Sequence, residues 1–233
     1  MANISARVSI RWLPAPASEP TSTLVTTSPN LQFVDLRLPA SLDNSTPPQW
    51  AIAGRTVVGT PMRWVHQIDS RMDTPGEDSG VNTPLPNGDI LEKGRMVDDE
   101  DGQVKDYEEV WRNVGIDEGV ALVLECDDDG GARGRVVRVG GYCQGMVKVG
   151  ERTSCERYVK DRGNGKWERV YRYGDVKIPC DLACLDRGLL GGSGEVQVLG
   201  EDGDRVTLER GVNVGDSLEV NGYTWKVTEK SLW

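Results

Sequence analysis

Apolar and polar residues alternate with a period of two along most of this chain, and no long segment shows the 3.6-residue period of an amphipathic helix. The apolar segments are short and end at glycines (28) and prolines (12), at about the 8 to 12 residue spacing typical of a sandwich or barrel. Ile178 to Leu185 is the one stretch expected to form a short helix. The pattern predicts an all-β protein, with roughly over a third of its residues in strands and under about 15% in helix.

Two stretches rich in proline, serine and glycine interrupt the first half, Pro39 to Pro48 and Asp73 to Gly88, and are expected to be long surface loops. The strands expected in that half are Val8 to Leu13, Leu24 to Thr27, Val34 to Leu38, Trp50 to Val58, Arg63 to Met72, Ile90 to Val97 and Tyr107 to Val114. The second half should hold strands at Val120 to Cys126 and Arg135 to Val149, and hairpins over 155–173, 196–208 and 217–228. A weak internal sequence similarity between Trp111-Arg-Asn-Val and Trp225-Lys-Val-Thr favours two similar β units, 1–117 and 118–233.

Turn residues and cross-strand pairs predict the register of three hairpins. Asn221-Gly222 is typical of a type I′ turn, which pairs Val220 with Tyr223 and Leu218 with Trp225. A three-residue loop ending at Gly165 avoids like-charge pairs, and it sets Lys160 opposite Glu168, Tyr158 opposite Val170 and Glu156 opposite Arg172. The same loop type at Glu201-Asp202-Gly203 aligns Val198 with Val206 and Val196 with Leu208.

Composition and charge narrow the class of partner. The longest uninterrupted apolar run, Val120 to Leu124, is far shorter than the ~18 to 20 residues that a bilayer crossing needs, so we expect no membrane insertion. Arg7 and Arg11 interrupt the N-terminal apolar pattern, which argues against a signal peptide and for a cytoplasmic or nuclear location. A net charge of −10 makes the phosphates of nucleic acid an unfavourable partner.

Cysteine and histidine offer little metal or redox chemistry. The five cysteines form an odd set without an export signal, which predicts buried free thiols. Cys180 and Cys184 lack the further ligands of a zinc site. His66 is the only histidine, so a site needing two imidazoles is impossible. We expect no metal site and no cofactor.

The candidate ligand-binding residues lie on two strand faces that are rich in aromatic side chains. On the first, alternation places Trp64, His66 and Ile68 together, with His66 facing inward. His66 is then a pocket base, an axial ligand for haem, or a core histidine bonded to a polar neighbour. The second face comprises Trp167, Arg169, Tyr171 and Tyr173. There Arg169 is expected either to pair with a ligand carboxylate or to belong to an outward aromatic stripe between the two β units.

An acidic segment is the candidate protein-interaction surface. Residues 98–129 hold thirteen carboxylates against Lys105 and Arg112, beginning with the run Asp98, Asp99, Glu100 and Asp101. Such a field steers basic partners toward the surface. The alternative is that the charge only keeps the protein soluble.

Several short blocks along the chain resemble a known family. They are Leu36-Arg37, Gln49 to Gly54, Tyr107 to Trp111, Val139 to Gly145, Ile178-Pro179 and Asn221 to Trp225. Together they resemble the fungal cytosolic family named after a yeast protein that interacts with a casein kinase I. The resemblance implies two packed lipocalin-like β-barrels and no catalytic residues.

Three functions are compatible with these observations. We expect first a non-catalytic interaction protein, an adaptor or substrate of a casein-kinase-I-type kinase. The alternatives are a carrier of a small apolar ligand in a barrel cavity, and a cofactor-free isomerase or cyclase. The absence of an evident acid and base pair in the sequence argues against the last of these.

Overall fold

The computed structural model describes residues 1–98, 101–128, 131–185, 195–199, 205–209 and 212–233, with the backbone alone for 195–199 and 205–209. Strands make up 61% of the structure, and the described residues hold a single short helix, α1 (Cys180–Ala183). The predicted all-β class is therefore confirmed. No helix in these described ranges has the length and hydropathy needed to cross a membrane.

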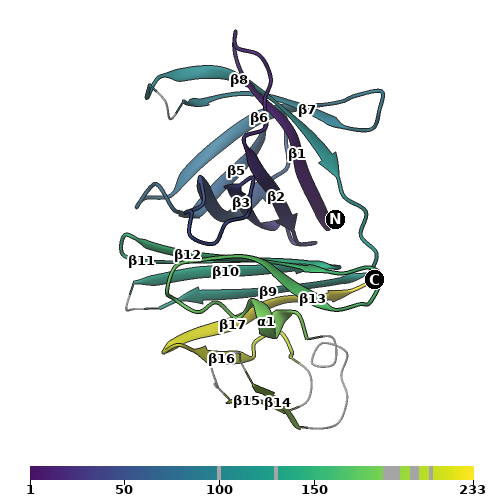
Figure 1. Ribbon diagram of the computed structural model, residues 1–233, viewed down its shortest axis with the longest axis vertical. Coiled ribbons are helices and arrows are strands. Elements are labelled where there is room, and N and C mark those ends of the chain that lie inside the picture. Colours follow the sequence, from purple (N-terminus) through teal and green to yellow (C-terminus); the bar gives the residue numbers. More distant parts are fainter. Residues whose placement is uncertain (99–100, 129–130, 186–194, 200–204, 210–211) are drawn as a thin grey trace.

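The first eight strands close into one antiparallel barrel, in which each strand pairs with the next and β8 pairs with β1 (Figure 1). They are β1 (Asn3–Trp12), β2 (Thr21–Thr27), β3 (Gln32–Pro39), β4 (Trp50–Val57), β5 (Met62–Asp69), β6 (Gly76–Pro84), β7 (Ile90–Val97) and β8 (Val104–Asn113). The expectation that Asp73 to Gly88 forms a loop was wrong, because β6 lies within it. Most side chains of β6 are exposed, and its sequence is accordingly polar. Its backbone nevertheless pairs with β5 and β7 and so completes the barrel.

The remaining strands form a seven-stranded antiparallel sheet in the order β13-β12-β11-β10-β9-β17-β16, and a separate hairpin, β14-β15. They are β9 (Val120–Asp127), β10 (Ala132–Val139), β11 (Tyr142–Val149), β12 (Arg152–Lys160), β13 (Trp167–Tyr173), β14 (Glu195–Leu199), β15 (Arg205–Glu209), β16 (Ser217–Val220) and β17 (Tyr223–Leu232). The second half thus differs from the predicted second barrel. Within the described residues β13 and β16 are the edges of the sheet and do not pair with each other.

The barrel lies on one face of the sheet, and α1 with the β14-β15 hairpin lies on the other side (Figure 1). Alternation along each strand of the sheet supplies both faces. Val137 of β10 packs with Val34 and Leu36 of the barrel, whereas its neighbour Val136 packs with Ile178 and Trp225 on the far face. Two hydrophobic cores therefore share the sheet, and the first fixes the barrel against it.

Two of the three predicted hairpin registers are confirmed. Leu218 lies opposite Trp225 across the Asn221-Gly222 turn, whose two residues have φ of 55° and 78°. Val196 and Val198 pair with Leu208 and Val206, although the loop at 201–203 lies outside the described residues. The third register was correct only for Glu156 and Arg172, because Lys160 lies opposite Trp167 and Tyr158 opposite Arg169.

Candidate functional site

The interior of the barrel contains a cavity of about 260 Å³, which we call the barrel cavity. Its outer lining comes from one end of the barrel, where β1, β3 and β5 begin and β2, β4 and β8 end. Apolar side chains there include Met1, Val25, Leu31, Val58, Met62 and Trp111. Its deeper lining is polar and includes four carboxyl groups, which we call the floor carboxyls: Asp35, Asp78, Glu92 and Glu109. The cavity combines an apolar outer wall with a charged floor.

Alternation on β3 explains how charged residues reach the inside of the barrel. Phe33, Asp35 and Arg37 line the cavity, whereas Val34 and Leu36 face the sheet and are fully buried there. The inward polar face of β3 can be buried because its charges pair with one another and with neighbouring strands.

Arg37 holds two of the floor carboxyls together. Its Nε lies 3.2 Å from Asp35 Oδ2, and its Nη1 lies 3.7 Å from Glu109 Oε1. The guanidinium also lies over the ring of Trp50, 4.7 Å from the ring centroid. The nearby carboxylates raise the pKa of Arg37 despite burial, which opposes the charged form, so this side chain is a permanent cation.

Arg7 supports Glu109 from behind the floor. Its Nη1 donates to Glu109 Oε1 at 2.6 Å, its Nε to Glu19 at 2.7 Å and its Nη2 to Thr21 at 2.9 Å. Every nitrogen of this buried guanidinium therefore has a partner in the protein.

His66 is held between two carboxylates. Nδ1 lies 3.1 Å from Asp69 Oδ2 and Nε2 lies 3.2 Å from Asp78 Oδ2. Burial alone would lower the pKa of His66, but the hydrogen bonds and charges of Asp69 and Asp78 raise it to about 9. The imidazole is therefore charged at neutral pH, and neither ring nitrogen is available as an axial ligand for haem.

Glu92 and Tyr107 form a buried pair at the floor. Tyr107 Oη donates to Glu92 Oε1 at 2.8 Å. Gly80 and Gly94, which face each other across β6 and β7, make room for it: a Cβ on Gly80 would lie 2.8 Å from Glu92 Cγ, and one on Gly94 would lie 2.6 Å from Tyr107 Oη. Glycine at both positions is thus required by the pair.

The protonation of Glu92 differs from that of an ordinary glutamate. Burial and the charge of Glu109 raise the pKa of Glu92 to about 8, although the Tyr107 hydrogen bond and Arg37 act in the opposite direction. Among the described residues, none forms an ion pair with Glu92. At neutral pH it is mainly a neutral acid facing a cavity.

Two buried polar side-chain atoms of cavity-lining residues have no hydrogen-bond partner within the described structure. They are Asp35 Oδ1 and Trp111 Nε1. Asp35 is only 6% exposed, so an unpaired carboxylate oxygen there costs free energy unless something else satisfies it.

Of the three candidate residues on β5, the structure places Trp64 and His66 in the lining of the cavity. The expectation that Ile68 shares their face was wrong. His66 lies opposite Gly54 and Ile68 opposite Ala53, so Gln67 has no partner and forms a β-bulge. The extra residue turns Ile68 outward into the core between barrel and sheet.

A second bulge divides the other predicted face. Tyr158 pairs with Arg169 and Arg157 with Tyr171, which leaves Val170 unpaired in β13. Tyr171 and Tyr173 consequently pack toward the barrel. Trp167 packs on the opposite face, where Arg138 lies 4.8 Å from its ring centroid.

Arg169 shares a small depression with Tyr158 and Glu156 on the far side of the sheet. The prediction of one face formed by Trp167, Arg169, Tyr171 and Tyr173 was therefore wrong, and none of the four lines the barrel cavity.

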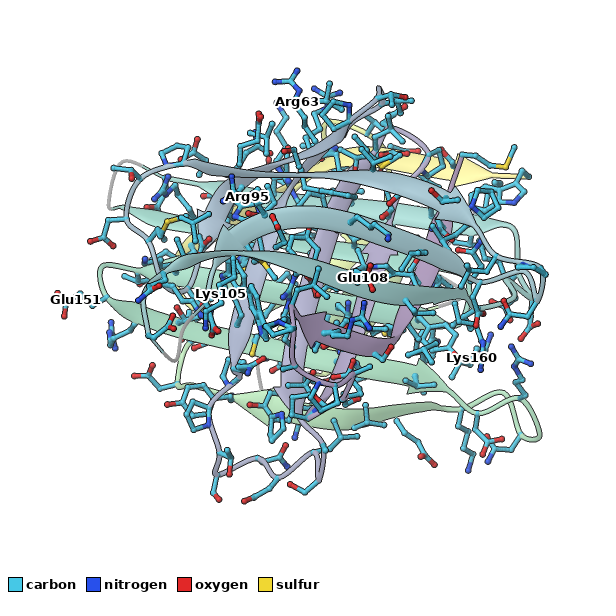
Figure 2. All side chains as sticks on the ribbon, turned by 90° about the horizontal axis from the view of Figure 1, so that it is seen from above. Arg63, Arg95, Lys105, Glu108, Glu151 and Lys160 are labelled. Carbon is cyan, nitrogen blue, oxygen red and sulfur yellow. The ribbon has the colours of Figure 1, made fainter. Side chains whose placement is uncertain are left out.

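The acidic run lies at the β7-β8 turn, and the described part of it is paired with cations. Lys105 Nζ lies 2.6 Å from Asp98 and 2.7 Å from Asp101. Asp99 and Glu100 lie outside the described residues. On the same barrel face, which points away from the sheet (Figure 2), Arg95 pairs with Asp106 and Lys93 with Glu108. Cations of β7 thus offset part of the charge that a count along 98–129 suggests.

Sequence reasoning missed the floor carboxyls. The available signal was alternation: Asp35 shares a face with Phe33 and Arg37, and Glu109 shares one with Tyr107 and Trp111. Ionisable residues on the same face as aromatic ones, in strands with an apolar opposite face, indicate a polar barrel interior.

Metal binding and disulfide chemistry have little support in the described residues. They contain no group of three or more His, Cys, Asp or Glu side chains placed to hold a metal ion. All five cysteines are buried free thiols, as predicted.

Comparison with known proteins identifies relatives of the same fold. The family model described as Protein HRI1 matches residues 3–202. A search of curated proteins finds no match. The crystal structure of an uncharacterised protein from Saccharomyces cerevisiae, YLR301w, superposes with a TM-score of 0.70 at 17% sequence identity, and the alignment covers 99% of each chain. This similarity establishes a shared fold over the full length of both chains.

Proposed function

This chain belongs to the HRI1 family, and we propose that it binds a small molecule with an apolar body inside the N-terminal barrel. The observation that carries the proposal is the cavity of about 260 Å³ with an apolar outer wall and convergent polar groups on its floor. Small barrels either fill their interior with side chains or hold one small ligand, and a cavity of this kind is typical of the second group.

Ligand titration tests the proposal. An apolar fluorophore should bind saturably with one site per chain and quench tryptophan emission, because Trp64 and Trp111 line the cavity. Val25→Phe adds volume inside the cavity and should reduce binding at least tenfold. Val81→Phe is the matched control, since Val81 is 46% exposed and lies outside the cavity lining.

The outcomes separate binding in the barrel from binding elsewhere. Equal loss of binding in Val25→Phe and Val81→Phe, or unsaturable binding by the wild type, would contradict the proposal. Thermal unfolding of both variants checks that each retains the fold.

A protein-interaction role is the second candidate. It is supported by the exposure of Asp101 and Asp106, whose side chains are 40% and 62% accessible, and by the family resemblance, which implies a casein-kinase-I-type kinase as partner. A basic substrate groove on such a kinase would be attracted to this acidic surface. Its test is the last prediction of the Discussion.

A further inference from the structure

The cationic side chains at the floor of the barrel cavity are already paired with carboxylates, whereas Trp111 Nε1, an uncharged donor, has no partner in the described structure. The two cationic side chains in its lining are Arg37 and His66. Arg37 contacts Asp35 and Glu109, and both ring nitrogens of His66 face carboxylates. A ligand carboxylate would have to displace one of these protein carboxylates to be recognised, and it would meet the negative charge of the others.

Acceptors, by contrast, remain available. The lining holds four floor carboxyls against two cations. Asp35 Oδ1 is buried without a hydrogen-bond partner, and Glu92 receives only the hydroxyl of Tyr107, with no ion pair in the described structure. The floor can therefore accept hydrogen bonds and positive charge that the protein itself does not supply.

We infer that the ligand is a small amphiphilic amine, whose ammonium group lies against the floor carboxyls while its apolar body fills the outer cavity. This inference rests on the proposed ligand-binding function and specifies its chemical class. The aromatic rings of Phe33, Trp64 and Trp111 in the lining suit such a cation, because an aromatic face attracts positive charge.

The volume limits the size of the amine. At ~30 Å³ for each water molecule, the cavity of about 260 Å³ has room for roughly nine waters. An amine with one aromatic ring and a two-carbon chain is of that size, so 2-phenylethylamine is a suitable probe.

Binding of a cation should release a proton. Glu92 faces Tyr107 and Glu109 of β8, Arg37 of β3 and Asp78 of β6. Burial and its acidic neighbours keep Glu92 mainly protonated at pH 7, and an ammonium ion beside it favours the ionised form. We expect roughly half to one proton to leave for each amine bound at pH 7.

Three ligands with the same ring but different charge give the direct test. Isothermal titration of the full chain compares 2-phenylethylamine, 2-phenylethanol and phenylacetate at pH 7, in buffers of low and high ionisation enthalpy. The amine should bind at least tenfold more tightly than the alcohol, and the acid more weakly than either. The buffer dependence of the heat measures the released proton.

Glu92→Gln keeps the shape and the acceptor for Tyr107 but removes the titrating group. It should abolish proton release and reduce the preference for amine over alcohol severalfold, while the alcohol still binds and so reports an intact cavity. Glu77→Gln is the matched control, because Glu77 is an exposed β6 residue paired with Arg63 outside the cavity. It should behave as wild type.

A second readout uses the unmodified protein. His66 is the only histidine, so its ring proton resonance can be followed by NMR without further assignment. A bound ammonium group near Asp78 should lower the pKa of His66, whereas a bound carboxylate should raise it.

The outcomes distinguish this inference from the proposed function. If the alcohol binds and the amine gains nothing over it, the amine inference is overturned while ligand binding stands. Tighter binding of phenylacetate, or a raised pKa of His66 with the amine, overturns it too. If neither these ligands nor an apolar fluorophore binds, both proposals fail. If Glu92→Gln no longer binds the alcohol, this variant cannot be interpreted. The wild-type protein then tests the inference through its preference for amine over alcohol and through the direction in which the amine shifts the pKa of His66.

Discussion

The inside of the barrel and the barrel-facing side of the sheet both bury charged side chains, but they use them differently. On the sheet, Arg157 donates to Gln144 Oε1 at 2.6 Å, Ser22 Oγ at 2.9 Å and Leu36 O at 2.8 Å. Lys148 donates to the carbonyl oxygens of Asp69 and Met72. These cations bind backbone and side-chain oxygens, and neither residue lines the barrel cavity or the depression that holds Arg169.

The barrel floor has the opposite balance. Within the described residues Asp35 Oδ1 lacks a hydrogen-bond partner and Glu92 lacks an ion-pair partner, and both side chains line the barrel cavity. Buried charge alone therefore does not indicate a functional site. Incomplete pairing next to a cavity does, because fully paired groups already have their stabilising contacts within the protein.

Removal of the buried cation Arg157 should have the largest effect. Arg157→Met preserves much of the apolar stem but leaves the acceptors of Gln144, Ser22 and Leu36 unpaired. We expect it to lower the free energy of unfolding by about 3 to 5 kcal/mol, measured from urea denaturation at pH 7.

Arg152→Met is the matched control for that experiment. Arg152 pairs with Asp175 through side chains that are 61% and 70% exposed, so its loss should cost under about 0.5 kcal/mol. A cost below about 1 kcal/mol for Arg157→Met would contradict the structural role assigned to this arginine.

Gly94→Ala tests the space made for the Glu92 and Tyr107 pair. A Cβ there would lie 2.6 Å from Tyr107 Oη and 2.6 Å from the backbone oxygen of Ser79. Displacing Tyr107 should destabilise the barrel by about 2 kcal/mol. At Gly115 a Cβ meets nothing within 4 Å, so Gly115→Ala should leave the thermal midpoint nearly unchanged, and equal effects of the two substitutions would count against the proposed packing.

Glu92→Gln should stabilise the protein in a pH-dependent way. The pKa of Glu92 is raised to about 8 in the fold, so the folded chain retains a proton that the unfolded chain loses above pH ~4.3. Stability of the wild type therefore falls as pH rises from about 4.3 to 8. The variant lacks this loss, and its advantage over wild type should grow by about 2 kcal/mol between pH 6 and 7.5.

Denaturation midpoints across that pH range provide the measurement for Glu92→Gln. Glu77→Gln should show a flat difference from wild type, because Glu77 is exposed. An advantage that shrinks as pH rises would mean that Glu92 is ionised in the fold.

The sequence pattern predicted the strands well and the side-chain faces less well. Alternation places Trp64 and His66 inside the barrel because each residue in a regular strand reverses direction. Ile68 and Tyr171 depart from the predicted faces since Gln67 and Val170 bulge. A bulge arises where two strands must match twist and curvature, which depends on partners distant in sequence.

The sequence pattern did not predict the floor carboxyls for a related reason. Asp35, Asp78, Glu92 and Glu109 come from four separate strands, and their meeting is a consequence of barrel closure. Closure depends on β6, whose exposed polar sequence has the composition of a loop. The charge count over 98–129 similarly overlooked Arg95 and Lys93, which lie on the paired strand β7.

The smallest expected effect concerns the acidic surface at the β7-β8 turn. Asp98 is 4% exposed and bonded to Lys105, so its removal would test folding as well as binding. Asp101→Asn combined with Asp106→Asn removes two exposed charges and leaves Asp98 in place. With a casein-kinase-I-type kinase as partner, association at low ionic strength should slow about two- to threefold, and the difference should vanish as salt screens the charges.

A double variant elsewhere on the surface separates local from global charge effects. Glu151→Gln with Asp175→Asn removes the same number of charges from the β11-β12 turn and from the segment after β13, outside the β7-β8 turn. If the acidic turn is the docking surface, this control should associate as fast as wild type. The reason is that at 0.1 M salt the electrostatic field of a surface charge extends only about 10 Å. Equal slowing in both variants would show that net charge alone matters, and no slowing in either would leave the barrel cavity as the remaining candidate site.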